Sequence, residues 1–119
     1  MSNWYHKIAT LQDVTRTFVV NAEAASLVFG FSSHLRDNEK TITLVYPNGE
    51  TRAERIYRKQ DYRISLDKNL LTFVAGDLVS FEKIDVSTFR CMRLAPRSSF
   101  EISKKLNKKN YVISSSPLN

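Results

Sequence analysis

The sequence predicts a single mainly β domain, arranged as an antiparallel barrel or sandwich. The chain has 119 residues, the size of one ordinary domain, and 42% hydrophobic residues with only three Gly and three Pro supply enough apolar material for one packed core. Residues 62–67 alternate between apolar and polar side chains, which is the period of a half-buried strand. Several such short runs are separated by turn residues, and closing the sheet removes its exposed edges.

Further segments carry strand signals in chain order. Residues 42–46 are rich in β-branched and aromatic side chains and stop at Pro47-Asn48-Gly49, which suits a tight turn before a second strand beginning near Glu50. Residues 78–84 follow a Gly-Asp pair, and residues 89–94 end at an Ala-Pro pair, so breakers bracket both segments. We therefore expect one hairpin and two later strands.

Two short segments have helical signals. The clearer one has Asn21 as N-cap, Glu23 in the first turn and Gly30 as the C-terminal stop. The second, residues 67–73, spans only about two turns, and a loop is its alternative.

The composition changes near the C-terminus. From residue 104 onward the chain is rich in Lys, Asn and Ser. We therefore expect one domain over residues 1–103, followed over residues 104–119 by a basic, Ser-rich tail or the start of a linker to another domain.

Basic charge is concentrated in two windows. The chain has 18 Lys and Arg against 12 Asp and Glu, a net charge of +6. Residues 52–63 hold five basic residues against two acidic ones, and residues 90–109 hold seven against one. Such segregation favours a polyanionic partner, with a solvated basic face as the alternative.

Groups that would support catalysis are missing from the sequence. His6 and His34 lie in different segments without zinc-binding spacing, and Cys91 lies inside an alternating strand, where a core thiol is favoured over a nucleophile. No Gly-rich phosphate loop occurs, nor any Glu-x-Lys or Asp-x-Lys triplet of the kind common in magnesium nucleases. We expect a binding domain that has no catalytic residues, metal or cofactor of its own.

Several motifs occur together in one order along the chain. They are His6–Arg16, Phe18–Asn21 followed by Ala22–Ala25, Thr41–Leu44, Asn48–Gly49, Gln60–Ile64 and Phe73–Phe81. This pattern, which covers roughly residues 5–84, resembles the B3 DNA-binding domain, whose members open with a Lys-containing strand and a Thr-x-x-Asp-Val-type turn. The resemblance implies a DNA-binding pseudobarrel, an open barrel of seven strands with two short helices, which places two arms in the major groove of duplex DNA.

The resemblance also implies which residues form the two arms. Carried over by position, the DNA-binding residues are Lys7, Thr10, Gln12, Thr15, Arg16 and Thr17 in and before the first arm, and Arg55, Tyr57, Arg58, Lys59 and Gln60 in the second.

Side-chain chemistry assigns roles within these arms. An Arg side chain can donate two hydrogen bonds to the two acceptors of guanine, and a Gln side chain can pair with the acceptor and the donor of adenine. We therefore expect Arg16, Arg58 and Gln60 to contact bases. Lys7, Lys59 and Thr15 are expected to bind phosphates, which set register and affinity. A carboxylate is unfavourable beside phosphates, so we expect Asp13 to cap the turn through backbone N–H groups instead. Trp4, Tyr5, Phe81 and Phe89 have strand spacing and are expected in the core rather than as stacking platforms.

The sequence departs from the plant members of this family. They carry a Gly-Trp pair where this chain has Asp67-Lys68, and a tryptophan before the second arm that is missing here. We therefore expect the bacterial type, a sequence-specific DNA recognition or effector domain of a type IIE or related restriction endonuclease, monomeric when isolated and linked to a nuclease domain in the full-length chain.

Two alternatives remain at this level: a plant-type transcription-factor domain, and a small β-barrel RNA-binding module or enzyme. No apolar run is long enough for a bilayer and no secretory signal opens the chain, so we expect no membrane partner. The expected location is the bacterial cytoplasm at the nucleoid, or the nucleus for the plant type.

Overall fold

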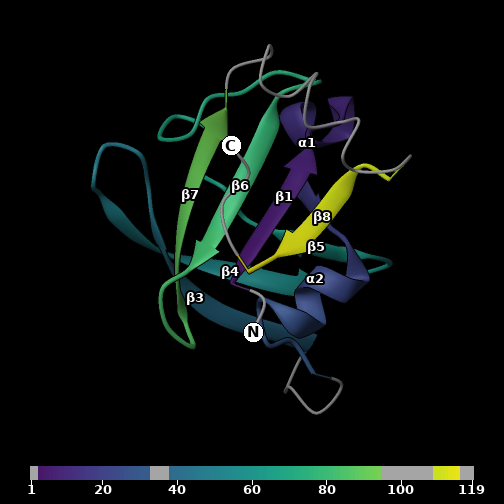
Figure 1. Ribbon diagram of the computed structural model, residues 1–119, viewed down its shortest axis with the longest axis vertical. Coiled ribbons are helices and arrows are strands. Elements are labelled where there is room, and N and C mark those ends of the chain that lie inside the picture. The colour runs from purple at the N-terminus through teal and green to yellow at the C-terminus, as the bar shows by residue number, and fades with distance from the viewer. Residues whose placement is uncertain (1–2, 33–37, 95–108, 116–119) are drawn as a thin grey trace.

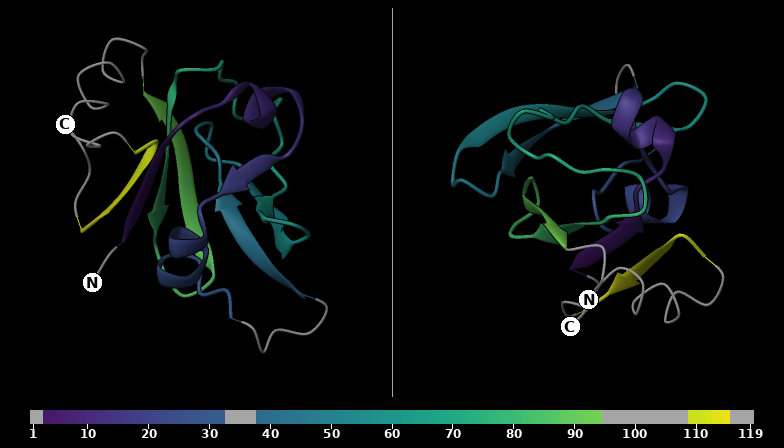
Figure 2. Two further views of the ribbon diagram at one scale, coloured as in Figure 1. Left: turned by 90° about the vertical axis from the view of Figure 1, so that its right-hand side faces the viewer. Right: turned by 90° about the horizontal axis from the view of Figure 1, so that it is seen from above.

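The computed structural model describes residues 3–32, 38–94 and 109–115. Within them, eight strands form one sheet that is curled into a half-barrel, accompanied by two short helices (Figure 1, Figure 2). The predicted mainly β class and the two short helices are confirmed, whereas the predicted number of seven strands is not. The elements are β1 (Trp4–Ile8), α1 (Leu11–Thr15), β2 (Phe18–Val20), α2 (Ala22–Leu27), β3 (Glu39–Val45), β4 (Thr51–Arg58), β5 (Tyr62–Ile64), β6 (Leu78–Lys83), β7 (Thr88–Leu94) and β8 (Tyr111–Ser114).

The strands are hydrogen-bonded in the order β2-β5-β4-β3-β7-β6-β1-β8. All neighbouring pairs are antiparallel except β3 and β7, which run parallel. Because β2 and β8 lie at opposite ends of this order, the sheet curls around a core while leaving two edge strands. The two segments expected to bind DNA both lie near the edge strand β2. Helix α1 directly precedes β2 in the chain, and β5 of the β4–β5 hairpin pairs with β2 in the sheet.

Aromatic side chains fill the inside of the curled sheet. Tyr5, Phe18, Phe29, Phe81 and Phe89 are fully buried. The rings of Phe29 and Phe89 lie 4.7 Å apart, and those of Tyr5 and Phe81 lie 5.9 Å apart and stack. This packing confirms that the aromatic residues with strand spacing are core residues, because a buried ring has no face left for a base.

The predicted hairpin is present between β3 and β4. Their register pairs Val45 with Thr51, and the Gly49 N–H donates to the carbonyl oxygen of Tyr46 at 2.8 Å. Gly49 has φ of +88°, a conformation that favours glycine. The turn chemistry therefore fixes the register of the two strands.

The helices agree only in part with the sequence prediction. Helix α2 begins after Asn21 and carries Glu23 in its first turn, as predicted. The Asn21 side chain makes no capping hydrogen bond, because its Oδ1 accepts from the Tyr5 hydroxyl at 2.5 Å. The other helix in the structure is α1, which forms in the segment that was expected to be a turn. Residues 67–73, expected as a helix or a loop, form no helix: they make a turn in which the N–H groups of Leu70 and Leu71 donate to the Asp67 carbonyl oxygen.

The segment expected as a tail contributes a strand. Residues Tyr111–Ser114 form β8, which pairs with β1 from Lys7↔Tyr111 to Trp4↔Ser114. The prediction of a tail is therefore wrong for these residues, and β8 accounts for the eighth strand. Residues 104–108 and 116–119 of that segment lie outside the described residues. In the described part of the chain, neither helix is long and apolar enough to span a membrane.

Candidate nucleic-acid interface

The two predicted arms project from the same side of the molecule. We call residues 10–17 the first arm and residues 55–60 the second arm. Figure 1 shows α1 and the turn between β4 and β5 both at the right, and the left panel of Figure 2, which turns this side toward the viewer, shows both together with β2. The order β2-β5-β4 explains the arrangement, because the first arm leads into β2 and the second arm forms the end of the adjoining hairpin.

The separation of the arms follows from strand register. Val20, Tyr62 and Arg58 are neighbours across β2, β5 and β4, and Arg16 lies four residues before Val20. With ~4.8 Å between strands and at most ~3.6 Å per residue from Val20 back to Arg16, the backbones of Arg16 and Arg58 lie within about 24 Å of each other. Because the major groove is ~12 Å wide and arginine side chains are long, two arginines within this span can reach one duplex.

Helix α1 in the first arm is fixed by a capping box. The Thr10 Oγ1 accepts the Asp13 backbone N–H at 3.2 Å, and the Asp13 Oδ2 accepts the Thr10 backbone N–H at 2.9 Å. The prediction that Asp13 caps this turn is confirmed. Because Asp13 is fully buried, its charge does not face an approaching phosphate.

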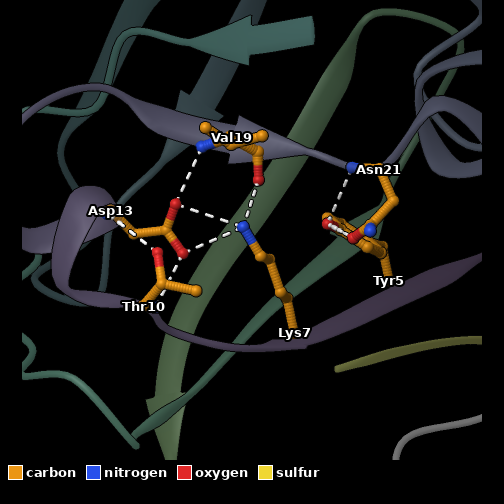
Figure 3. A network of polar contacts seen from close by, with 6 residues as sticks. All are labelled: Tyr5, Lys7, Thr10, Asp13, Val19 and Asn21. Carbon is orange, nitrogen blue, oxygen red and sulfur yellow. Dashed lines mark hydrogen bonds and ion pairs between the residues drawn. The ribbon is translucent and has the colours of Figure 1, made fainter. Parts of the chain in front are cut away.

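A buried ion pair anchors the first arm to the sheet (Figure 3). The ammonium group of Lys7 lies 2.9 Å from Asp13 Oδ2 and donates to the Val19 carbonyl oxygen at 2.6 Å. Asp13 Oδ1 also accepts the Val19 N–H at 2.9 Å. Lys7 is only 2% exposed, so the expectation that it binds a phosphate needs correction: its charge is used inside the domain.

A second lysine holds the far end of the first arm. The ammonium group of Lys68 donates to the carbonyl oxygens of Val14 and Arg16. Partial burial lowers the pKa of Lys68 from its ordinary value. Sequence reasoning missed this role, although the Asp67-Lys68 departure from the plant B3 pattern marked the position. The first arm is thus attached at both ends, by Lys7 and by Lys68.

The second arm is the end of the β4–β5 hairpin. Its turn is closed by the Lys59 N–H, which donates to the Asp61 carbonyl oxygen at 3.0 Å. Arg58, Lys59 and Gln60 are exposed, and the Arg58 guanidinium lies over the Tyr62 ring at 5.7 Å. Stacking on an aromatic ring limits the conformations of an arginine while leaving its N–H groups available.

Two other second-arm residues lie on the outer face of β4. The Arg55 guanidinium lies 4.6 Å from the centre of the Tyr57 ring and forms an exposed ion pair with Glu39 at 3.2 Å. Tyr57 is half-buried. Arg55 therefore already has a carboxylate partner, whereas Arg58 and Lys59 at the hairpin end have none among the residues that the structure describes.

Unpaired basic side chains are concentrated on the arms. In residues 3–32, 38–94 and 109–115, most Lys and Arg side chains form ion pairs or donate to backbone carbonyls. Those with neither kind of partner are Arg16, Arg58, Lys59, Lys83 and Lys109. Three of these lie on the arms, where their charge is available to an anion.

One further basic residue, Arg63, lies between the arms. It pairs with Val19 of β2 and Tyr57 of β4 across the sheet, and its Nε donates to Asp61 at 2.6 Å. This hydrogen bond raises the pKa of the Arg63 guanidinium. The basic window of residues 52–63 contains Arg63, but only the strand register places it beside both arms.

The remaining polar candidates are structural. His6 is buried, with its Nδ1 2.7 Å from the Ser80 Oγ, and His34 lies outside the described residues. Cys91 is fully buried, and burial raises the pKa of its thiol to about 12. Among the described residues, no three His, Cys, Asp or Glu side chains are placed to hold a metal ion.

Comparison with known proteins shows a likeness of fold. No protein-family model matches the sequence, and no curated protein matches it. Among solved structures, the chain is similar to the N-terminal domain of Helicobacter pylori LlaJI.R1, with a TM-score of 0.78 and 11% sequence identity. The match covers 97% of this chain and 99% of that chain, so the two share one fold over almost their whole length.

Proposed function

We propose that this domain binds double-stranded DNA in a sequence-specific manner, through two arms placed in the major groove, and that it belongs to the DNA-binding pseudobarrels. The observation that carries the proposal is that three of the cations without a partner in the described part of the chain, Arg16, Arg58 and Lys59, lie on two arms at the same side of the sheet. Exposed cations on two arms at one side of the sheet suit duplex DNA, whereas an RNA-binding sheet would need exposed aromatic residues for stacking, and the aromatic residues with strand spacing are buried here.

The exposed arm residues divide into two roles. Arg16, Arg58 and Gln60 are the proposed base readers, because their side chains match the hydrogen-bond patterns of guanine and adenine. Lys59 and Thr15, together with the other exposed first-arm residues, are proposed to contact phosphates and sugars. Lys7 is removed from this set, since its buried ammonium group binds Asp13.

The biological setting is proposed from the structural neighbour. LlaJI.R1 is a restriction endonuclease component, and the neighbour is its N-terminal domain. We propose that this chain serves as the DNA recognition domain of a bacterial restriction endonuclease, with catalysis carried out by a separate domain or subunit. In this arrangement the domain needs no catalytic residues of its own.

The proposal is tested by direct binding. The protein selects its site from a pool of random duplexes, and fluorescence anisotropy then gives affinities for that site and for random duplex. Arg58→Ala should cost about 1–3 kcal/mol at one base-pair position, because one bidentate contact to guanine is lost. Lys59→Ala should weaken selected and random duplexes alike.

Two results would overturn the proposal. If the protein does not bind duplex DNA even at low salt, double-stranded DNA is excluded as its partner. If it binds RNA more tightly than duplex DNA, its partner is RNA. An unchanged ratio of selected to random affinity in Arg58→Ala would show that Arg58 is not a base reader.

A further inference from the structure

Arg63 occupies the part of the sheet that joins the two arms. On β5, Ile64 faces the core and is fully buried, so the neighbouring Arg63 points to the opposite, outer face. On that face its cross-strand neighbours are Val19, whose N–H is bound by Asp13 of the first arm, and Tyr57 of the second arm. A duplex held by both arms would therefore pass over Arg63.

The guanidinium of Arg63 is held by one of its three nitrogens. Its Nε donates to Asp61 Oδ1 at 2.6 Å, and the two terminal nitrogens donate no hydrogen bond to any residue that the structure describes. The terminal pair is the fork that matches the O6 and N7 acceptors of guanine. Asp61 therefore fixes the direction of the side chain while leaving its recognition edge unused.

We infer that Arg63 is a further base-reading residue, directed to a guanine in the major groove, and that Asp61 is its positioning residue. The inference rests on the proposed function, since it deepens the recognition of duplex DNA at the same interface. Arg63 would be a base-reading residue in the middle of the sheet, because β5 is hydrogen-bonded to β2 on one side and to β4 on the other. The base-reading residues proposed on the arms lack a strand on both sides.

Electrostatics favours a base over a phosphate as the ligand of this pair. The Arg63–Asp61 pair has no net charge, and Asp61 is itself partly exposed, with 43% of its side chain accessible. A phosphate would be attracted by the arginine and repelled by the adjacent carboxylate, so little affinity would result. The edge of a guanine carries no net charge, so the Asp61 carboxylate does not repel it. Its binding requires that the two terminal nitrogens of Arg63 point toward it, and the hydrogen bond to Asp61 keeps this orientation.

The chain contains a matched control pair. Arg52 and Glu50 have the same two-residue spacing and lie 2.9 Å apart at the start of β4. They adjoin the β3–β4 turn, which lies on the opposite side of the molecule from the arms (Figure 1). Substitutions in this pair therefore remove a similar ion pair without touching the proposed interface.

The test combines variants with a modified base. Arg63→Ala, Arg63→Lys, Asp61→Asn, the double variant Arg63→Ala/Asp61→Asn, Arg52→Ala and Glu50→Gln are compared with the wild-type protein on the selected site. Guanines in this site are replaced one at a time by 7-deazaguanine, which lacks the N7 acceptor. For the wild-type protein, we expect replacement of one particular guanine to weaken binding about tenfold, and Arg63→Ala to abolish that effect.

The other variants define the role of Asp61. Asp61→Asn should reduce the discrimination at the same guanine and have no further effect in the Arg63→Ala background, because the two residues act as one unit. Arg63→Lys keeps the charge but lacks the fork, so it should behave as Arg63→Ala at this base. Arg52→Ala and Glu50→Gln should leave all affinities unchanged. Thermal unfolding checks that each variant is folded.

Several outcomes would overturn the inference. If Arg63→Ala weakens selected and random duplexes equally, Arg63 binds phosphate. If Asp61→Asn tightens binding to every sequence by one factor, Asp61 acts only by repelling DNA. An unchanged affinity in Arg63→Ala, with wild-type protein still selecting a site, would reject this inference and leave the proposed function standing, whereas failure of the wild-type protein to bind duplex DNA would reject both.

Discussion

At the scale of single residues, burial decides the role of each charged group. Lys7 and Lys59 are both lysines in segments expected to bind DNA, yet Lys7 is 2% exposed and bound to Asp13, while Lys59 is exposed at a hairpin end. Sequence reasoning assigned phosphate binding to both, because it could not tell on which side of β1 the Lys7 side chain lies. The assignment of Asp13 as a cap was correct because the Thr-x-x-Asp spacing acts locally.

The buried pair gives a stability prediction. Lys7→Met should lower the free energy of unfolding by about 3–5 kcal/mol, because Asp13 would be left buried without its ammonium partner. The measurement is equilibrium unfolding in urea. Arg52→Met serves as the control, since its exposed pair with Glu50 should contribute less than about 1 kcal/mol. Equal losses in the two variants would show that the Lys7–Asp13 pair has no special structural role.

At the scale of elements, the first arm is a short helix that packing contacts hold in place. Helix α1 has five residues, too few to be stable alone, so its conformation depends on the capping box and on the lysines that attach it to the sheet. Its exposed face carries Gln12 and Thr15, and the exposed Arg16 follows directly as its C-cap. The turn at residues 67–73, where a short helix was expected with a loop as its alternative, likewise serves the first arm, since it positions Lys68 against the end of α1.

Lys68 gives the prediction at this scale. Lys68→Met should speed up amide hydrogen exchange in the first arm and weaken binding to the selected duplex about tenfold, with a smaller effect on random duplex. Without Lys68, the carbonyl groups of Val14 and Arg16 lose their hydrogen-bond donor and the first arm is less ordered in the free protein. Ordering the arm on binding then costs free energy, which lowers the affinity for DNA. Lys68→Arg should restore part of the affinity.

The control for Lys68 is a similar lysine elsewhere. Lys40 donates to the Phe29 carbonyl oxygen at 2.9 Å, and burial lowers its pKa as well. Lys40→Met should leave hydrogen exchange in the first arm and DNA affinity unchanged. If both variants weaken binding to the same degree, the effect comes from general destabilisation and not from the arm.

At the scale of the whole molecule, the pairing of charges matters more than their number. The net charge of +6 includes many side chains that are neutralised by carboxylates, such as Arg90 by the partly exposed Glu82 and Arg93 by the buried Asp77. Of the five cations that lack partners in residues 3–32, 38–94 and 109–115, three lie on the arms. We therefore expect the electrostatic part of DNA binding to come from a few residues.

Salt dependence measures this expectation. If Arg16, Arg58 and Lys59 neutralise three phosphates on random duplex, log affinity should fall against log salt concentration with a slope of about −2.7. Lys59→Ala should reduce the steepness by about 0.9, whereas Lys83→Ala, an unpaired lysine on β6, should not change it. A slope near −10 would show that phosphate contacts extend far beyond the two arms.

The sequence by itself determined the mainly β class, the β3–β4 hairpin, helix α2, the aromatic core and the cap at Asp13. These features depend on side-chain period and on contacts within a few residues, which are written in the order of the chain. The tertiary structure decided that Tyr111–Ser114 joins the sheet, that Lys7 faces inward, that Lys68 supports the first arm, and that Arg63 lies between the arms. Each of these features depends on how segments distant in sequence pack and pair. That pairing is decided by which arrangement buries the apolar faces of all the strands in one core, and no local sequence pattern contains this information.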